Sequence, residues 1–290
     1  MTPENILDTF TSRMVDIELQ YRATKQVTGN ELKLIKKYSD DIQDKPDLKK
    51  ISKSHNQMIF TDAITGEYQF YGRVVHDLDD IYKAALLRKN RQYQWLLVEA
   101  HEEFEDFLEY IYAYLGHNHD DLWPLSDYGN IKLPELSEKD FDWYLSKSRN
   151  KKSPKEILNR LRSYFPNIKN IESTNKLNIN LDLALSLIEN LRHNIVHTGG
   201  RISDTNSFSE NTLSKSGLHN NGKPKDEYIE FINSFFGQVD GISIINLLEE
   251  PADHAFPFSI GAHINIFGKL TGYLLAYAYI IITEIQAKET

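Results

Sequence analysis

The strongest constraint on the fold is a wide apolar face, at helical spacing, in the segment from residue 94 to residue 115. Eight apolar side chains form this face: Leu96, Leu97, Ala100, Phe104, Phe107, Leu108, Ile111 and Leu115. Segments 3–26 and 181–196 repeat the periodicity, which is that of an amphipathic α-helix. Because such faces are stable only when they pack against one another, we predict a mainly helical protein with a substantial core.

Residues 1–73 are expected to form an N-terminal helical extension that also carries a small β-hairpin. The expected elements are helices at 3–26 and 31–42 and strands at 58–60 and 68–71. The sequence Thr28-Gly29-Asn30 is expected to separate the two helices, because glycine and asparagine are poor helix formers. The sequence Thr65-Gly66-Glu67 is expected to form the turn of the hairpin.

Residues 74–290 are expected to form the main helical bundle. Its first helix is predicted from Val74 to Leu115, with a break near Asn90. Further helices are predicted at 137–145, 153–164 and 259–287. The short apolar segments 226–236 and 241–248 are left open in type, and a strand is one interpretation of the second. The segment 201–225 is rich in Ser, Asn, Gly and Thr without periodicity, so it is predicted to be a long irregular excursion.

Composition limits the possible chemistry. The 290-residue chain contains no cysteine, which excludes disulfides, thiolate metal sites and a cysteine nucleophile. The net charge of −9 argues against a protein that coats nucleic acid indiscriminately. The start of the chain lacks a signal sequence, and the apolar run 270–283 is too short to span a bilayer. A cytoplasmic protein without a membrane segment is therefore expected.

The densest group of chemically active side chains closes the segment 181–196. Arg192, His193, Asn194 and His197 are followed by Gly199-Gly200, a pair typical of a helix end. A guanidinium presents a planar fork to phosphate oxygens, and an imidazole exchanges protons near neutral pH. These residues are sufficient for cleaving RNA without a metal, because the 2′-hydroxyl needs a proton acceptor and the phosphate needs a stabilising cation.

The spacing from Arg192 to His197 resembles the R-x4–6-H motif of the HEPN superfamily. The resemblance covers roughly residue 91 to the C-terminus. It implies a helical bundle that dimerises and acts as a metal-independent endoribonuclease without a cofactor, in toxin–antitoxin or antiviral defence systems. It also implies that Arg192 stabilises the phosphate, His197 acts as acid or base, and His193 orients the site. Some superfamily members are catalytically inactive binding or regulatory modules, which is the alternative function.

Helix geometry raises a question about this motif. Residues five apart on an α-helix differ by about 140° in direction and about 7.5 Å in rise. Arg192 should therefore align with the buried stripe, and His197 with His193 on the polar one. The two meet at one phosphate only if the helix unwinds near Asn194 or a second copy supplies one of them. The resemblance implies the second copy, and a partner antitoxin or defence protein is also expected.

Two further sets of residues are candidates for the site. Glu105, at the border of the apolar face, is expected to pair with Arg192 and fix its side chain. Asn194 is included as a second supporting residue. A cation-rich stretch between residues 147 and 176 leads into the motif helix and is expected to bind the RNA backbone. Its candidate contacts are Lys151, Lys152, Lys155, Arg160 and Arg162.

Other interpretations of these residues remain open. Arg192 and His197 could simply satisfy a carboxylate and the helix end. His193 and His197 lie four apart, as zinc ligands often do, although Asn194 stands where a zinc protease needs Glu. The loop 117–121, His-Asn-His-Asp-Asp, resembles a metal site but is more often a turn or cap. No metal is expected.

Overall fold

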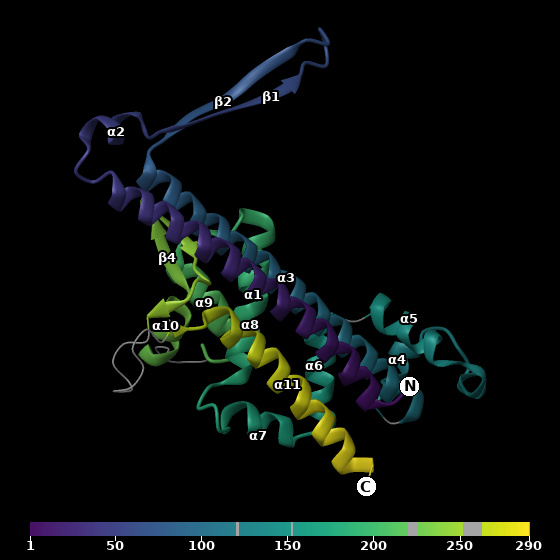
Figure 1. Ribbon diagram of the computed structural model, residues 1–290. Helices are drawn as coiled ribbons and strands as arrows, with labels where there is room; N and C mark the ends of the chain where they lie inside the picture. The colour runs from purple at the N-terminus through teal and green to yellow at the C-terminus, as the bar shows by residue number, and fades with distance from the viewer. Residues whose placement is uncertain (120–121, 152, 220–224, 252–262, 290) are drawn as a thin grey trace. The chain divides into compact units, whose positions relative to one another are not determined.

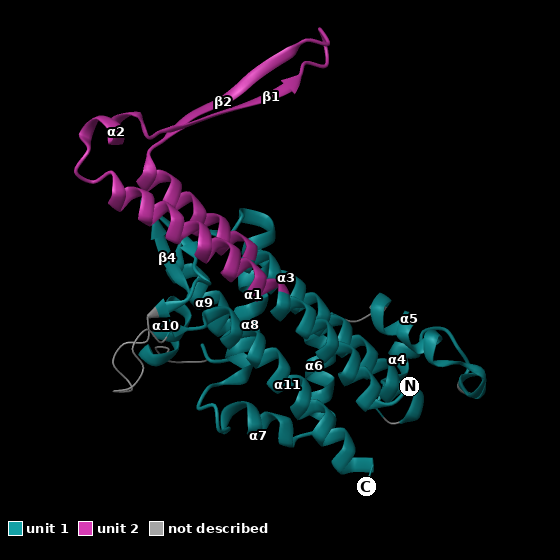
Figure 2. Cartoon of the chain, viewed as in Figure 1, with its two compact units in different colours: residues 1–19, 93–290 teal, residues 20–92 magenta. Residues whose placement is uncertain are grey.

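A computed structural model describes residues 1–119, 122–151, 153–219, 225–251 and 263–289 (Figure 1). The chain is mainly helical, as predicted, with a few short strands. It divides into two compact units, one of residues 1–19 and 93–290 and one of residues 20–92 (Figure 2). The predicted boundary between residues 73 and 74 falls inside strand β2 (Tyr68–His76), and the first nineteen residues group with the larger unit.

The start of α1 (Pro3–Asp41), with the buried Phe10 and Ile17, joins three other helices in the core of the larger unit. The other three are the second half of α3 (Leu78–Asn118), α8 (Leu181–Thr198) and α11 (Ile266–Glu289). Each places a stripe of fully buried side chains in this core, such as Leu108 on α3 and Ile188 on α8. The buried stripes of these helices are the apolar faces that the sequence predicted to be buried.

Shorter elements complete the larger unit. They are α4 (Leu125–Tyr128), η1 (Leu133–Glu138), α5 (Phe141–Lys151), α6 (Pro154–Tyr164), α7 (Asn167–Ser173), α9 (Thr205–Lys215) and α10 (Asp226–Asn233). The predicted start of α6 is confirmed, because Ser153 and Glu156 form a reciprocal capping box. The helix predicted at 137–145 was wrong in register, since a 3₁₀ turn precedes α5, which begins at Phe141.

A small antiparallel sheet lies next to the end of α8. Its order is β3 (Arg201–Ile202), β5 (Ile242–Ile245), β4 (Phe236–Val239), so the segment 241–248, whose type the sequence left open, contains a strand. A further pair joins β6 (Glu250–Pro251) and β7 (His263–Ile264). The backbone N–H of Ile245 donates to the carbonyl of Gly200, 2.8 Å away, so the sheet is attached to the motif helix by hydrogen bonds.

The irregular excursion predicted at 201–225 was wrong for the described residues up to 219. Strand β3 begins it, and helix α9 follows from Thr205. The Asp204 carboxylate accepts the N–H groups of Asn206 and Ser207, which starts the helix despite its polar composition. Phe208 and Leu213, the two apolar residues of α9, are both buried, and two residues are too few to show as an apolar stripe in the sequence.

The smaller unit contains the predicted hairpin. Strand β1 (Ser54–Thr61) pairs antiparallel with β2, and helix α2 (Pro46–Ile51) precedes it. The predicted helix break at 28–30 was wrong, because α1 (Pro3–Asp41) is continuous. The first bundle helix was also placed too early and given a false break, since α3 begins at Leu78 and passes through Asn90 uninterrupted. Single poor helix formers cost about 1 kcal/mol or less, which a long helix tolerates.

Helix α11 is the one described helix that is long and apolar enough to cross a membrane. In the structure 56% of its most apolar stretch is buried against the rest of the protein. Its buried face includes Leu274 and Tyr277, which have no solvent exposure. This burial places α11 in the core of the bundle. The part of the predicted helix at residues 259–262 lies outside the described residues.

Candidate functional site

Helix α8 carries the motif and is regular to its end. The Asn180 side chain caps its start by accepting the N–H of Leu183 at 2.9 Å. At the other end Gly199 and Gly200 have φ angles of 68° and 75°, the left-handed geometry predicted from the sequence. The helix therefore does not unwind near Asn194. The Asn194 amide donates to the carbonyl of Asn190, 2.9 Å away, so its side chain bonds to the helix itself.

Arg192 is held by an acidic residue on α3. Its Nη2 donates to Oε1 of Glu102 at 2.7 Å. The expected partner, Glu105, was wrong by almost one helical turn. Glu102 was missed because its side chain is 56% exposed and belongs to the polar face of α3. Arg192 Nε is buried and has no hydrogen-bond partner among the described residues, so the guanidinium retains a donor for a ligand.

His193 and His197 lie side by side on the exposed face of α8. Their ring centroids are 4.4 Å apart, with an angle of 49° between the planes. Both side chains are exposed to solvent. His193 also lies in the wall of a cavity that it shares with Arg192, whereas His197 lies one turn further along the helix. The two imidazoles thus extend the site from the cavity toward the end of α8.

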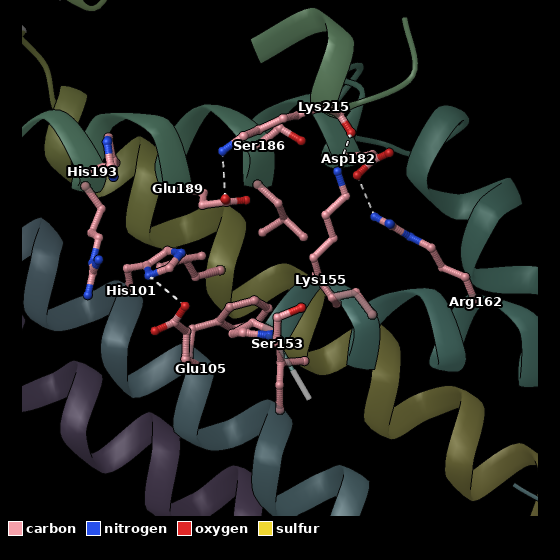
Figure 3. A pocket seen from close by; sticks show the side chains of 17 residues that line it. His101, Glu105, Ser153, Lys155, Arg162, Asp182, Ser186, Glu189, His193 and Lys215 are labelled. Atoms are coloured by element: carbon pink, nitrogen blue, oxygen red, sulfur yellow. Dashed lines mark hydrogen bonds and ion pairs between the residues drawn. The ribbon is translucent and has the colours of Figure 1, made fainter. Parts of the chain in front are cut away.

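The cavity has a volume of about 340 Å³ and lies between α3, α6 and α8 (Figure 3). Helices α9 and α11 each contribute one residue to its wall. Its polar lining consists of His101, Glu105, Ser153, Lys155, Arg162, Asp182, Ser186, Glu189, Arg192, His193 and Lys215. Its apolar lining consists of Phe104, Leu108, Pro154, Leu158, Leu185 and Leu274. A pocket with an apolar floor and converging polar groups is typical of a ligand site.

Glu105 and His101 lie close together in this cavity, on one face of α3 (Figure 3). Burial raises the pKa of Glu105 to about 7, an effect that the positive charge of Arg192 opposes. Burial also lowers the pKa of His101 to about 4, and Arg192 lowers it further. His101 Nδ1 lies 3.7 Å from Glu105 Oε1, too far for a hydrogen bond. At neutral pH a neutral imidazole therefore faces a carboxyl group that is ready to gain or lose a proton.

The predicted RNA-binding cations have different environments. Lys155 is exposed at the cavity, with Nζ 3.3 Å from the carbonyl oxygen of Lys215, and Arg160 is exposed on α6. Arg162 is only 8% exposed and binds Glu172 and Asp182, so its assignment as an RNA contact is corrected to a core ion pair. Lys152 lies outside the described residues, as does the side chain of Lys151.

The candidate metal ligands do not assemble into a site within the part of the chain that the structure describes. No group of three or more His, Asp or Glu side chains there is arranged to hold a metal ion. His117 packs edge-on against Tyr144, and His119 lies 3.3 Å from Glu289. Asp120 and Asp121, the other members of that loop, lie outside the described residues.

Comparison with known proteins gives no relative: no family model matches the chain, and no significant match was found among curated proteins or solved structures. The function is therefore inferred from the residues of the site. Its main components are the ion-paired Arg192, the adjacent imidazoles of His193 and His197, and the cavity that begins beside them.

Proposed function

We propose that this protein is a metal-independent endoribonuclease of the HEPN type that acts as a homodimer. The observation that carries the proposal is that Arg192 and His193 line one cavity, with the ring of His197 4.4 Å from that of His193. A permanent cation and two titratable rings at one exposed helix end are the groups that RNA cleavage needs. The proposed reaction uses only these side chains, and its products identify it.

The reaction transfers two protons and exchanges one P–O bond for another. An imidazole of the His193–His197 pair takes the proton of the ribose 2′-hydroxyl, and the 2′-oxygen attacks the adjacent phosphorus. The bond from phosphorus to the 5′-oxygen breaks, and a protonated imidazole supplies the proton that the leaving oxygen needs. The products are a 2′,3′-cyclic phosphate and a free 5′-hydroxyl. Arg192 stabilises the negative charge on the phosphoryl oxygens.

The ion pair of Arg192 is compatible with phosphate binding. Its partner Glu102 is 56% exposed, and exposed ion pairs contribute only about 0–1 kcal/mol. A phosphate dianion or diester can therefore replace Glu102 at small cost. Glu102 then acts as a holder that keeps the guanidinium extended toward α3 until RNA binds.

The regular geometry of α8 indicates that a second copy of the chain is needed to bring Arg192 and His197 to one phosphate. Because the helix is continuous through Asn194, Arg192 and His197 of one chain differ by about 140° in direction. A two-fold axis near the end of α8 would bring Arg192 of one copy toward His197 of the other. We infer that the complete site is formed by two chains.

The test is RNA cleavage by the purified full chain in the presence of EDTA. Arg192→Ala, His193→Ala and His197→Ala should each reduce the rate by at least about 100-fold. Two substitutions serve as matched controls that should leave the rate unchanged. Arg88→Ala removes another arginine from a surface pair, with Glu31 at 2.6 Å, and His219→Ala removes another exposed histidine.

The outcome decides between the nuclease and the binding module. Cleavage that requires an added metal, or cleavage that survives all three motif substitutions, would refute the proposal. RNA binding without cleavage would instead favour a catalytically inactive HEPN-like module. A toxin or antiviral role is tested in cells, where expression of the wild-type chain should arrest growth and the His197→Ala chain should not.

A further inference from the structure

The cavity beside Arg192 is larger than phosphate binding requires. Its volume of about 340 Å³ is at the lower end for small-molecule pockets, which suits one nucleoside-sized group. Its floor is made of Phe104, Leu108, Leu158 and Leu185, which can contact the faces of a planar ring. Single-stranded RNA is read by splaying a base into such a pocket.

The charges of the cavity favour a neutral ligand over an anion. Lys155, Arg162, Arg192 and Lys215 contribute positive charge, and Glu105, Asp182 and Glu189 oppose them. Arg162 is already paired with Asp182 at 2.6 Å. Lys215 is already paired with Glu189 at 2.7 Å. A second phosphate would gain little here, whereas a nucleobase has both donors and acceptors to match the mixed lining.

Three polar groups of the cavity retain hydrogen-bonding capacity. His101 Nδ1 and Arg192 Nε are buried and have no hydrogen-bond partner within the described parts of the chain. Leaving such groups buried and unpaired is unfavourable, and a ligand that bonds them recovers that cost. The Glu105 carboxyl lies beside His101 and opens to the same space (Figure 3).

We propose that this cavity is a guanine-specific base site, in which the Glu105 carboxylate accepts the N1–H and N2–H groups of guanine. Among the four RNA bases only guanine offers two adjacent donors of this kind, together with the acceptors O6 and N7 on its other edge. The ammonium of Lys155 is the donor for those acceptors, while Arg192 remains with the phosphate. The inference rests on the proposed ribonuclease function and adds its substrate preference, cleavage on the 3′ side of guanosine.

The electrostatics of Glu105 agree with this role. Its pKa of about 7 reflects burial in the empty cavity, so the free carboxylate is poorly solvated. Two N–H groups from guanine would solvate it and favour the charged form. Adenine presents no matching pair of donors at the same positions, so its binding leaves the carboxylate unpaired.

The test uses the full chain in EDTA and the four nucleoside 3′-monophosphates, titrated by calorimetry. Guanosine 3′-monophosphate should bind about tenfold or more tightly than the other three. Glu105→Gln should remove this preference, because an amide donates where guanine also donates. Glu103→Gln, on the same helix but outside the cavity wall, should keep it. Lys155→Gln, an exposed substitution that leaves the core intact, should weaken guanosine 3′-monophosphate alone.

Mapping of cleavage sites on an RNA of mixed sequence separates this inference from the proposed function. Cleavage after all four bases, or equal binding of the four nucleotides, would overturn the guanine site and leave the nuclease standing. Selective binding of guanosine 3′-monophosphate without any cleavage would support the base site while refuting the nuclease. Failure to bind any of the four would overturn the inference.

Discussion

Arg192 on α8 donates to Glu102 on α3 across 2.7 Å, and this contact sets the position of the guanidinium at the cavity. Glu105, one turn further along α3, acts on the same arginine only through its charge. One acidic residue thus holds the guanidinium from the exposed side while another faces the cavity. Glu105 is the more buried of the two carboxylates, and this burial raises its pKa to about 7.

Glu102→Gln should have a small effect on stability and a favourable effect on RNA binding. The ion pair is exposed, so its loss should change the free energy of unfolding by less than about 1 kcal/mol. Removing the competing carboxylate should leave RNA affinity unchanged or raise it. Urea unfolding and RNA binding measured together check this, and a large loss of affinity would show that Glu102 does more than hold Arg192.

Glu105→Gln should change how stability depends on pH. The folded-state pKa of Glu105 is about 7 and its ordinary value is 4.5, so its contribution to stability is complete below about pH 4.5 and is lost as pH rises through 7. Glutamine does not ionise, so the variant does not lose this stability as the pH rises. After allowance for partial exposure, it should gain about 1–2 kcal/mol relative to the wild type between about pH 5 and pH 8.

His101 has the opposite sign and supplies an internal control. Its folded-state pKa of about 4 lies below the ordinary 6.5, so stability from its neutral ring is lost as pH falls from about 6.5 toward 4. In the wild type this loss and the effect of Glu105 oppose each other between about pH 4.5 and 6.5. Urea unfolding of Glu105→Gln should therefore show a steeper loss of stability in acid. Parallel pH curves for the two proteins would contradict both assignments.

Gly200→Ala should destabilise the end of the motif helix. Gly200 has φ +75°, and an added Cβ would lie 2.6 Å from Oε1 of Gln94. Gln94 itself donates to the carbonyl of Ile245 at 2.7 Å, so it has little freedom to move. The expected loss is about 2–4 kcal/mol, from backbone strain and this clash together.

Gly217→Ala is the matched control for that substitution. Gly217 has a similar φ of +70°, but an added Cβ would meet nothing within 4 Å. Only the backbone strain, about 1 kcal/mol, should remain. Thermal or urea unfolding measures both variants, and equal losses would show that the contact with Gln94 is unimportant.

Arg162→Met should destabilise the protein without selectively weakening RNA binding. Arg162 binds Glu172 and Asp182 at 2.7 and 2.6 Å, and removing it leaves buried acidic charge unpaired. A loss of about 3 kcal/mol in the free energy of unfolding is expected. Arg160→Met, at an exposed position on the same helix, should change stability by less than about 0.5 kcal/mol. The reverse ranking would restore Arg162 as a surface contact.

A mixture of Arg192→Ala and His197→Ala chains tests whether two copies form one site. Random pairing makes half of the dimers mixed, and one of the two composite sites in each mixed dimer contains both residues. Activity should therefore recover to about a quarter of the wild-type rate if the subunits exchange. No recovery, with dimers confirmed by light scattering, would place the whole site within one chain.

The sequence predicted the elements whose signals are local. Three kinds of local feature were predicted correctly: the cap at Ser153, the glycines that end α8, and the apolar stripes of α3 and α8. Each is determined by residues within a few positions of one another. The breaks predicted at Gly29 and Asn90 were wrong, because the continuity of a long helix outweighs one unfavourable residue.

The candidate site was predictable only in part. Arg192 and the two histidines stand together in the sequence, but the partner Glu102 on α3 and the cavity residue Lys215 on α9 come from separate segments. Helix periodicity indicates which face is buried and not which residue of a neighbouring helix lies opposite. That choice depends on how far one helix is shifted along another, which a single sequence does not specify.

The attachment of Gly200 to the small sheet has a consequence for the proposed catalysis. Helix ends normally fray, yet here Gly200, shortly after His197, accepts a hydrogen bond from the backbone N–H of Ile245 in β5, and Gln94 of α3 in turn donates to the carbonyl of Ile245. In the proposed ribonuclease the backbone that carries the two imidazoles would therefore keep one position before RNA binds, and little backbone entropy would be lost on binding. Slow amide hydrogen exchange at Val196 and His197 would be the signature of this preorganisation.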